Sequence, residues 1–345
     1  MKYIKLFSEH NDYTDYMESE NYIAPNLSYC INEHEVHFEE QPRDYSKEYL
    51  TIEALENGNV YFYYAEHKSY DTSGDKQTYI EYSKDKGVTW NRTTRTSSDA
   101  ITITIPMTAG EIVYFRGDNE RFVCYNEGTQ YDVSRFGSDI RFNVYGNIAS
   151  LLYAGNFIGQ TESANGYEFQ YFFSCVGSYQ CLVVDASNLV LPFLSFNFQI
   201  YSGMFYNSQT LLYAPSLPST KLSHGCYSEM FRGCTSLTTA PELPATTLAQ
   251  HCYSSMFCQC SSLTTAPELP AVYVNDGAYT AMFYNCQNLS YIKAMFTERQ
   301  TTISTFQWVS GVSNTGTFVK NSAAQWSDTS VNGIPTGWTV ETASE

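Results

Sequence analysis

The residues of this sequence best suited to chemistry are cysteines and histidines in its second half. His251, Cys252, Cys258 and Cys260 fall within one short stretch, and thiolate and imidazole are ligands that zinc prefers. Tetrahedral zinc sites usually use paired C-x₂₋₄-C knuckles on opposed turns, whereas these residues follow a 26-residue period. The sequence therefore predicts no metal site here.

Two histidine–cysteine pairs contain the residue types of a nucleophile and its general base. They are His224 with Cys226 and His251 with Cys252. Neighbouring side chains on a short turn usually point apart. Neither an orienting Asn or Asp nor an oxyanion-hole pattern accompanies the pairs. We therefore predict no catalytic residue.

The cysteines follow a period rather than a ligand pattern. Cys234, Cys260 and Cys286 are 26 residues apart, and so are Cys226 and Cys252. A thiol is a good small filler for an apolar interior. We expect cysteines of successive repeats to pack in ladders; a disulfide between repeats and a metal site are the alternatives.

The same period governs a Met–Phe pair that is followed by a leucine. The predicted repeat core consists of Met204, Phe205, Leu211, Met230, Phe231, Leu237, Met256, Phe257, Leu263, Met282, Phe283 and Leu289. A period of about 20 to 29 residues with recurring leucines is typical of a leucine-rich-repeat solenoid, whose coils stack to share one core. We expect each coil to combine a short helical or 3₁₀ turn with an extended segment, and like side chains to form ladders.

The repeats resemble those of a known family. The stretch CYSEMFRGCTSLTTAPELPATTLA, residues 226–249, is similar to the BspA-like leucine-rich repeats of Bacteroides-type gut bacteria and their phages. Residues 1–38 resemble the start of structural proteins of those phages, and residues 308–341 resemble the cap that follows such repeats. The resemblance implies adhesion or a virion-surface role. The longer period and the proline in each extended segment depart from the family, so no binding face is transferred from it.

A polar strip on the extended segments is the predicted contact surface. It comprises Tyr213, Ser216, Thr238, Thr239, Glu242, Thr264, Thr265 and Glu268. Solenoids display extended binding surfaces of this kind. Glu242 and Glu268 share one repeat position, but two carboxylates are few beside the roughly six to eight oxygens that calcium takes. We expect the two carboxylates to be solvated rather than bridged by a cation.

Residues 82–90, YSKDKGVTW, match the S-x-D-x-G-x-T-W Asp-box of sialidases and other propellers. In that motif the Asp and Gly shape a hairpin turn and the Trp packs beneath it. A propeller carries such a box in several blades, and this chain has one copy. The motif therefore predicts a structural hairpin.

Charge and composition argue against several classes of function. The 36 acidic and 19 basic residues give a formal net charge of −17, which offers no basic surface to nucleic acid or an anionic membrane. Residues 1–20 lack the apolar core of a signal peptide, and no run approaches the roughly 18–20 apolar residues of a membrane span. We expect a protein made in a bacterial cytoplasm with mostly reduced cysteines.

Short β-prone runs separated by Gly- and Asn-containing turns fill residues 49 to about 119 and predict a small antiparallel sandwich or barrel. The predicted regions are an N-terminal attachment module of strand, helix and strand at 1–47, an Ig-like β-sandwich at 48–123, a connecting β segment or solenoid N-cap at 124–164, the leucine-rich-repeat solenoid at 165–298 and a β-rich C-terminal cap at 299–345. The fold class is mainly β with a small N-terminal α+β segment. Trp308, Trp326 and Trp338 are expected in the core of the cap rather than stacked on sugars.

These features together predict a non-enzymatic phage virion structural protein, a head- or tail-fibre-like appendage. Its N-terminal region would bind other virion proteins, and its solenoid would bind a host surface protein or glycan. No cofactor, nucleic acid or membrane insertion is expected. The sequence is compatible with a homo-oligomer but does not specify the oligomeric state. The alternatives are a bacterial cell-surface or secreted leucine-rich-repeat adhesin and, least favoured, a carbohydrate-active enzyme. The predicted location is the virion, or the bacterial surface for the adhesin.

Overall fold

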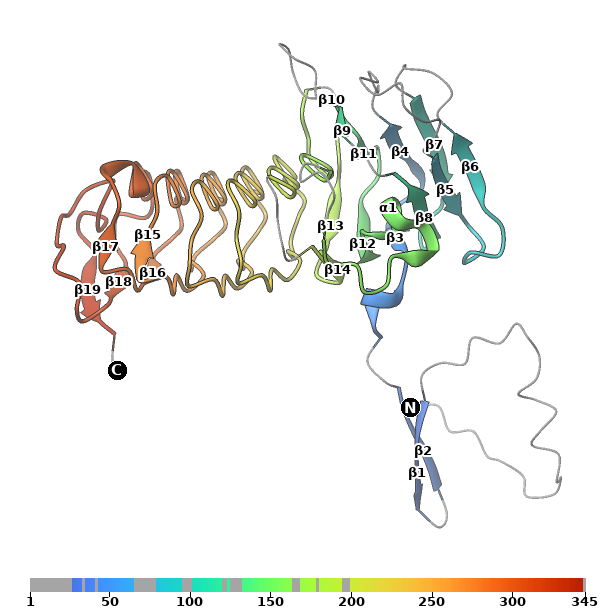
Figure 1. Cartoon of the computed structure of the whole chain (residues 1–345), viewed down its shortest axis with the longest axis horizontal. Helices are drawn as coiled ribbons and strands as arrows, with labels where there is room; N and C mark the ends of the chain where they lie inside the picture. Colours follow the sequence, from blue (N-terminus) through green and yellow to red (C-terminus); the bar gives the residue numbers. More distant parts are fainter. Residues whose placement is uncertain are drawn as a thin grey trace. The chain divides into compact units, whose positions relative to one another are not determined.

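The computed structural model describes residues 27–32, 35–40, 43–64, 79–94, 101–119, 123–124, 132–162, 168–177, 180–193 and 199–343 (Figure 1). Within them the chain is mainly β, with several sheets and very little helix, as the sequence predicts. No helix in this part of the chain has the length and apolar character that crossing a bilayer requires.

The elements follow one another along the chain with short strands throughout. The strands are β1 (Leu27–Asn32), β2 (Glu35–Glu40), β3 (Leu50–Ala54), β4 (Gly58–Tyr64), β5 (Tyr79–Ser83), β6 (Asn91–Thr94), β7 (Ile101–Met107), β8 (Ile112–Asp118), β9 (Val123–Cys124), β10 (Asp132–Val133), β11 (Arg135–Ser138), β12 (Phe142–Asn147), β13 (Val183–Asp185), β14 (Leu189–Val190), β15 (Tyr273–Val274), β16 (Tyr291–Ala294), β17 (Glu298–Arg299), β18 (Thr317–Lys320) and β19 (Thr339–Thr342). The helices are η1 (Tyr45–Lys47), α1 (Ser150–Tyr153), η2 (Ala154–Asn156) and η3 (Thr302–Thr305), of which only α1 is an α-helix.

The chain forms two compact units, Met1–Asp44 and Tyr45–Glu345. The described part of the first unit is an antiparallel pair, in which β1 and β2 run from Leu27 opposite Glu40 to Asn32 opposite Glu35. The strand and the helix expected within residues 1–26 lie outside the described residues.

Two sheets form the first part of the larger unit. One has the strand order β11-β4-β7, and the other has the order β13-β12-β3-β8-β5-β6 with β14 also paired to β12. In β4 and β8 buried residues alternate with less buried ones, as expected for strands with one face on a core. The rings of Phe115 in β8 and Phe136 in β11 lie 4.9 Å apart, so the apolar faces of the two sheets meet.

The strands predicted within residues 49–119 are confirmed as β3, β4, β5, β7 and β8. Residues 124–164, which the sequence suggests as a connecting segment, also supply strands to both sheets, because β11 pairs with β4 and β12 pairs with β3. β13 and β14 then run parallel to β12. This parallel pairing joins the sheets to the repeats that follow.

The Asp-box forms the turn between the antiparallel strands β5 and β6. The carboxylate of Asp85 accepts the backbone N–H of Thr89 at 2.8 Å and the hydroxyls of Thr89 and Ser83 at 2.5 and 2.7 Å. Trp90 donates its indole N–H to the carbonyl of Gly87 at 2.9 Å, beneath the turn. Gly87 has a φ of 87°, a left-handed conformation that glycine adopts without strain.

A charged network attaches this hairpin to the sheet. The guanidinium of Arg116 lies 3.9 Å from the ring centroid of Trp90 and 2.6 Å from the carboxylate of Glu81. Glu81, which is 4% exposed, also pairs with Arg92 at 2.7 Å. Burial opposes ionisation of Glu81, but hydrogen bonds from both guanidinium groups outweigh it and lower its pKa. The Asp-box hairpin is thus held in place from both of its strands.

From residue 199 onward the chain winds through successive turns that share one backbone pattern (Figure 1). In residues 225–233 every second N–H donates to a carbonyl of the next turn at 2.8–3.0 Å, as Tyr227 does to Cys252. The N–H groups between them donate to the carbonyl three residues earlier, as Ser228 does to Gly225. The alternation recurs in residues 251–260 and 279–286. A continuous backbone ladder therefore joins these turns.

Every fourth residue of these turn segments is left-handed. Gly225, Glu229 and Gly233 have φ values of 62°, 57° and 77°, and the next turn repeats this at His251, Ser255 and Gln259 with 57°, 55° and 64°. A non-glycine residue in this conformation costs roughly 1–2 kcal/mol. The turns therefore contain the 3₁₀-type hydrogen bonds that the sequence predicts but no helix, because the left-handed residues interrupt these bonds.

Two ladders of aromatic rings fill the interior. Phe136, Phe173, Phe205, Phe231, Phe257 and Phe283 stack in sequence with neighbouring centroids 5.4–5.8 Å apart and interplanar angles of 6–13°. Tyr201, Tyr227, Tyr253, Tyr279 and Trp308 form the second ladder at 6.1–6.3 Å. The twelve residues predicted to form the repeat core are all 0% exposed. Like side chains thus meet across successive turns, as the repeat predicts.

The extended segments between the turn segments are joined differently. Within residues 199–343, no backbone hydrogen bond links 212–219 to 238–247, or 238–247 to 264–270. Only the outer segments pair, since Ala186 donates to Tyr213 and Ala266 donates to Tyr291, each at 2.9 Å. The middle segment is held by its buried side chains, such as Leu243, rather than by a sheet.

The backbone pattern continues for one turn beyond residue 298, where the sequence analysis ended the repeat. Phe283 donates its N–H to the carbonyl of Trp308 at 2.8 Å, the same step that links Phe257 to Met282. Trp308 is fully buried and donates its indole N–H to Gly333 at 2.8 Å. β16, β18 and β19 then form a parallel sheet over the last turn.

The other two tryptophans of this region also pack inside the protein. Trp338 is 7% exposed, and the ring of Trp326 stacks on Phe296 with centroids 4.6 Å apart. Both indole N–H groups donate to backbone carbonyls, at 2.7 and 3.0 Å. Trp308 and Trp338 thus lie in the core, as the sequence predicts, and Trp326 is partly buried against it.

We expect Gly203→Ala to destabilise the protein more than Gly110→Ala. Both glycines are left-handed, with φ values of 61° and 82°, so both variants lose about 1–2 kcal/mol from backbone strain. At Gly203 an added Cβ would also overlap the ring of Tyr171, whereas nothing lies within 4 Å at Gly110. Crowding of this kind adds about 1–3 kcal/mol. Urea unfolding of the two variants measures the difference, and equal losses would contradict the packing at Gly203.

Asp85→Asn should weaken the protein at neutral pH and have little effect near pH 2. Hydrogen bonds from the side chain and backbone of Thr89, and from Ser83, lower the pKa of Asp85 from 3.8 to about 2. The ionised carboxylate therefore stabilises the fold above pH 3.8, and this contribution is lost as the pH falls to about 2. Unfolding free energies of both proteins between pH 2 and 7 test this; a difference independent of pH would exclude the carboxylate as its source.

Candidate functional site

All eight residues of the predicted polar strip are exposed. They come from three successive extended segments, and one repeat position carries Tyr213, Thr239 and Thr265. The next residue at that position is Tyr291, in β16, which is 37% exposed compared with 57% for Tyr213. A tyrosine therefore lies at each end of a row with two threonines between. Tyr291 is not among the eight predicted residues, although the 26-residue period places it in this row.

The two carboxylates of the strip have different surroundings. Pro241, Glu242, Pro267 and Glu268 help line a shallow hollow of about 450 Å³ between neighbouring extended segments. Glu268 pairs with Lys293 at 2.9 Å, and this hydrogen bond raises the pKa of the Lys293 ammonium. A lysine thus balances one carboxylate of the strip.

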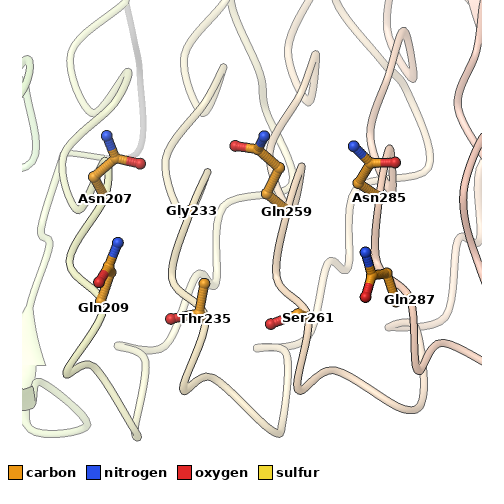
Figure 2. Close-up of a pocket in the computed structure, with 8 residues that line it drawn as sticks. All are labelled: Asn207, Gln209, Gly233, Thr235, Gln259, Ser261, Asn285 and Gln287. Carbon is orange, nitrogen blue, oxygen red and sulfur yellow. The ribbon is translucent and has the colours of Figure 1, made fainter.

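A second surface lies on the turn segments, where four successive turns place neutral polar residues side by side (Figure 2). One row consists of Asn207, Gly233, Gln259 and Asn285, and the row beside it consists of Gln209, Thr235, Ser261 and Gln287. We call these eight residues the amide groove. They line a hollow of about 380 Å³. No charged or aromatic residue contributes to its lining.

Backbone conformation explains part of this composition. The first row occupies a left-handed position, with φ values of 57° at Asn207, 77° at Gly233 and 59° at Asn285. Glycine and asparagine adopt this conformation most easily. Gln259, at 64°, has no such preference, and no residue of the second row has a positive φ. The backbone therefore does not account for the amides of Gln259, Gln209 and Gln287.

The side chains of the amide groove are not used within the protein. In the described part of the chain, none of the five amide groups or two hydroxyls of the groove forms a side-chain hydrogen bond, although Gln259, Gln209 and Gln287 are exposed. An Asn/Gln ladder that stabilised the stack would bond amide to amide from turn to turn. The amides of the exposed Gln209, Gln259 and Gln287 are open to solvent, whereas Asn207 and Asn285 are half-buried. The sequence carried a signal for this surface, because both rows recur with the 26-residue period.

Charged residues beside the groove in the sequence are paired with each other. Arg232 lies 2.6 Å from the carboxylate of Glu229, which also accepts the hydroxyl of Tyr171 at 2.8 Å. Burial and the negative charge of Glu229 raise the pKa of Tyr171, so this tyrosine stays protonated. The ion pair leaves no net charge next to the groove.

The cysteines in the repeats are buried structural groups. Cys226, Cys234, Cys252, Cys260 and Cys286 are each 0% exposed. Cys234, Cys260 and Cys286, which are 26 residues apart, each donate the thiol S–H to a phenylalanine carbonyl of the preceding turn. The distances are 3.1 Å from Cys234 to Phe205, 3.0 Å from Cys260 to Phe231 and 2.9 Å from Cys286 to Phe257. All eight cysteines from 175 to 286 are free thiols.

The histidine–cysteine combinations do not come together as chemical sites. The ring of His224 packs edge-on against that of His251 at 5.5 Å between centroids. Burial raises the pKa of Cys226 to about 12 and that of Cys252 well above its usual range. Among the described residues, no group of three or more His, Cys, Asp or Glu side chains is arranged to hold a metal ion.

Comparison with known proteins adds no assignment to this geometry: no family model, curated protein or solved structure matches the chain.

We expect the buried thiols of the repeats to resist alkylation in the folded protein. At pH 8 a thiol with a pKa of about 12, such as Cys226, is almost entirely protonated and therefore a poor nucleophile. Iodoacetamide should modify Cys226, Cys252 and Cys260 only after urea is added, as peptide mass spectrometry would show.

Zinc-bound thiolates would also resist alkylation, so the metal content of the purified protein is the control. Zinc in stoichiometric amount, or rapid alkylation of these cysteines without urea, would contradict their role as packed thiols.

Proposed function

We propose that this chain is a non-enzymatic structural protein of a phage particle that displays a repeat surface for binding to the host. In this proposal residues 165–298 form a BspA-like leucine-rich-repeat solenoid in a head- or tail-fibre-like appendage. The observation that carries the proposal is that each turn contributes both to the core and to an exposed polar surface. Apolar residues of the turns are buried in one continuous core, while rows of polar residues from successive turns remain exposed.

The interior is well suited to a rigid display scaffold. One hydrophobic cluster extends from Leu50 in β3 to Trp338 near the C-terminus, so the sheets and the stacked turns share a core. Repeat arrays of this kind gain stability from the interface between neighbouring turns. The surface rows are therefore held at fixed spacing, which suits recognition of a repetitive partner.

The departure from ordinary leucine-rich repeats concerns where the turns are joined. Parallel strands on one face normally supply the backbone bonds of such a solenoid. Here most of the bonds run along the turn segments, and the extended segments at 212–219 and 238–247 are not paired with each other. The prolines at 215 and 241 fit this arrangement, because proline lacks the N–H that a strand pairing would use.

The absence of catalysis in this proposal rests on the state of the nucleophiles. Cysteine is the most reactive nucleophile of the repeats, and burial raises the pKa of Cys226, Cys234, Cys252, Cys260 and Cys286. The Asp-box carboxylate of Asp85 is used in three hydrogen bonds within its own turn. Neither group is available for attack on a substrate.

The phage assignment draws on the resemblance of residues 1–38 to the start of phage structural proteins. A separate N-terminal unit, Met1–Asp44, is compatible with an attachment role. Binding to other virion proteins would then involve this unit, and binding to a host surface protein or glycan would involve the turns.

Purified particles from a host that carries the gene test this proposal. We expect peptides of the chain in the particle at an abundance similar to other structural proteins, and gold-labelled antibody against residues 199–343 on an appendage or the head. Recombinant chain added in excess should lower phage adsorption to host cells several-fold. Absence from particles together with presence on the bacterial surface would refute the virion role and favour the adhesin.

A further inference from the structure

We propose that the amide groove binds an extended, uncharged glycan whose chain runs from turn to turn along the stack. The inference rests on the proposed function and specifies its ligand and its site. It differs from the predicted strip, because the groove lies on the turn segments and shares no residue with the extended segments.

The chemistry of the lining selects for hydroxyl groups. Each of the five amide side chains offers two N–H donors and a carbonyl acceptor, and the hydroxyls of Thr235 and Ser261 do both. A sugar hydroxyl likewise donates and accepts. These groups have no partner among the described residues, so a ligand would replace only water.

The absence of charge narrows the class of ligand. The groove contains no cationic side chain, Arg232 is neutralised by Glu229, and the whole chain carries a net charge of −17. A polyanion such as an acidic polysaccharide would be repelled. A peptide partner would require apolar anchors, which typically carry the binding energy of protein interfaces. The lining offers none, so a neutral glycan fits best.

The spacing of the rows matches a repetitive ligand. The phenylalanine rings beneath Asn207, Gly233, Gln259 and Asn285 belong to the same turns and stack 5.6–5.8 Å apart. This step is close to the length of one sugar ring in an extended polysaccharide. Successive sugars can therefore meet equivalent residues of successive turns. At the left-handed position of the second turn, Gly233 lets the side chain of Asn207 pack against the backbone, since an added Cβ would overlap the amide oxygen of Asn207.

This geometry predicts how affinity depends on chain length. The site spans four turns, so a tetrasaccharide should bind more tightly than a disaccharide, and longer oligomers should gain little more. Each contact is weak, because the lining has no aromatic face for a sugar to stack on. Many copies on one particle would raise the effective affinity.

The test uses the full chain and neutral oligosaccharides of two to six residues from the malto-, cello-, laminari-, xylo- and manno- series, with oligogalacturonate as the acidic comparator. Calorimetry should detect binding of at least one neutral series, with affinity rising up to the tetrasaccharide. The variant Gln209→Ala/Gln259→Gly/Gln287→Ala should weaken it about tenfold or more, since it removes three amides. Glycine at 259 preserves the left-handed backbone, and circular dichroism checks that the variant is folded.

The matched control is Thr238→Ala/Thr264→Ala, which alters the polar strip and should change the affinity less than about twofold. Loss of binding in this control but not in the groove variant would overturn the groove while keeping the display function. Absence of binding to every neutral series, or preference for oligogalacturonate, would also overturn it. Detection of the chain in particles is independent of these results.

A second arm separates a glycan from a protein ligand on host cells. Periodate cleaves vicinal diols of sugars, and protease removes surface proteins. If the labelled chain no longer binds cells treated with periodate but still binds cells treated with protease, the inference is supported. Binding lost only after protease identifies a protein ligand and overturns it.

Discussion

The alternating backbone hydrogen bonds between neighbouring turns are the constraint on which the rest of this structure depends. Every second N–H of a turn segment donates to the next turn, so adjacent turns must lie in register, residue against residue. This register brings Phe231 onto Phe257 and Tyr227 onto Tyr253 with nearly parallel rings. The same register places the exposed residues in straight rows. Core and surface are therefore two results of one hydrogen-bond pattern.

Much of the repeat could be predicted from the sequence. The 26-residue period of Met, Phe and Leu identified the buried residues, because side chains that stack on copies of themselves must recur at one interval. The period could not reveal the conformation of the backbone. Left-handed residues occur at Glu229, Ser255 and Ala281, whose types carry no signal for that conformation, since it is imposed by bonds to the neighbouring turn.

The sequence also does not show where the repeat begins and ends, because the backbone pattern and the stacking extend past the repeated motif. Trp308 occupies the position of Met282 in the next turn, and the backbone pattern continues although the motif has ended. At the other end Phe136 belongs to a β-strand but serves as the first ring of the phenylalanine ladder. On the surface, the exposed strip followed from the period. The two rows of the amide groove recur with the same period, but a period does not show which of the recurring polar residues together line a hollow.

The two ends of the ladders also bear on how this protein can change its length. Phe136 offers a ready-made platform for the first turn, and Trp308 closes both ladders, so every turn between them meets a similar neighbour on each side. Removing or duplicating one 26-residue unit would leave the remaining contacts intact. The near-identity of residues 226–245 and 252–271 is the pattern expected of units that are gained or lost by exchange between repeats. Such exchange would lengthen or shorten the exposed rows in whole steps, while the platform and the closing tryptophan stay unchanged.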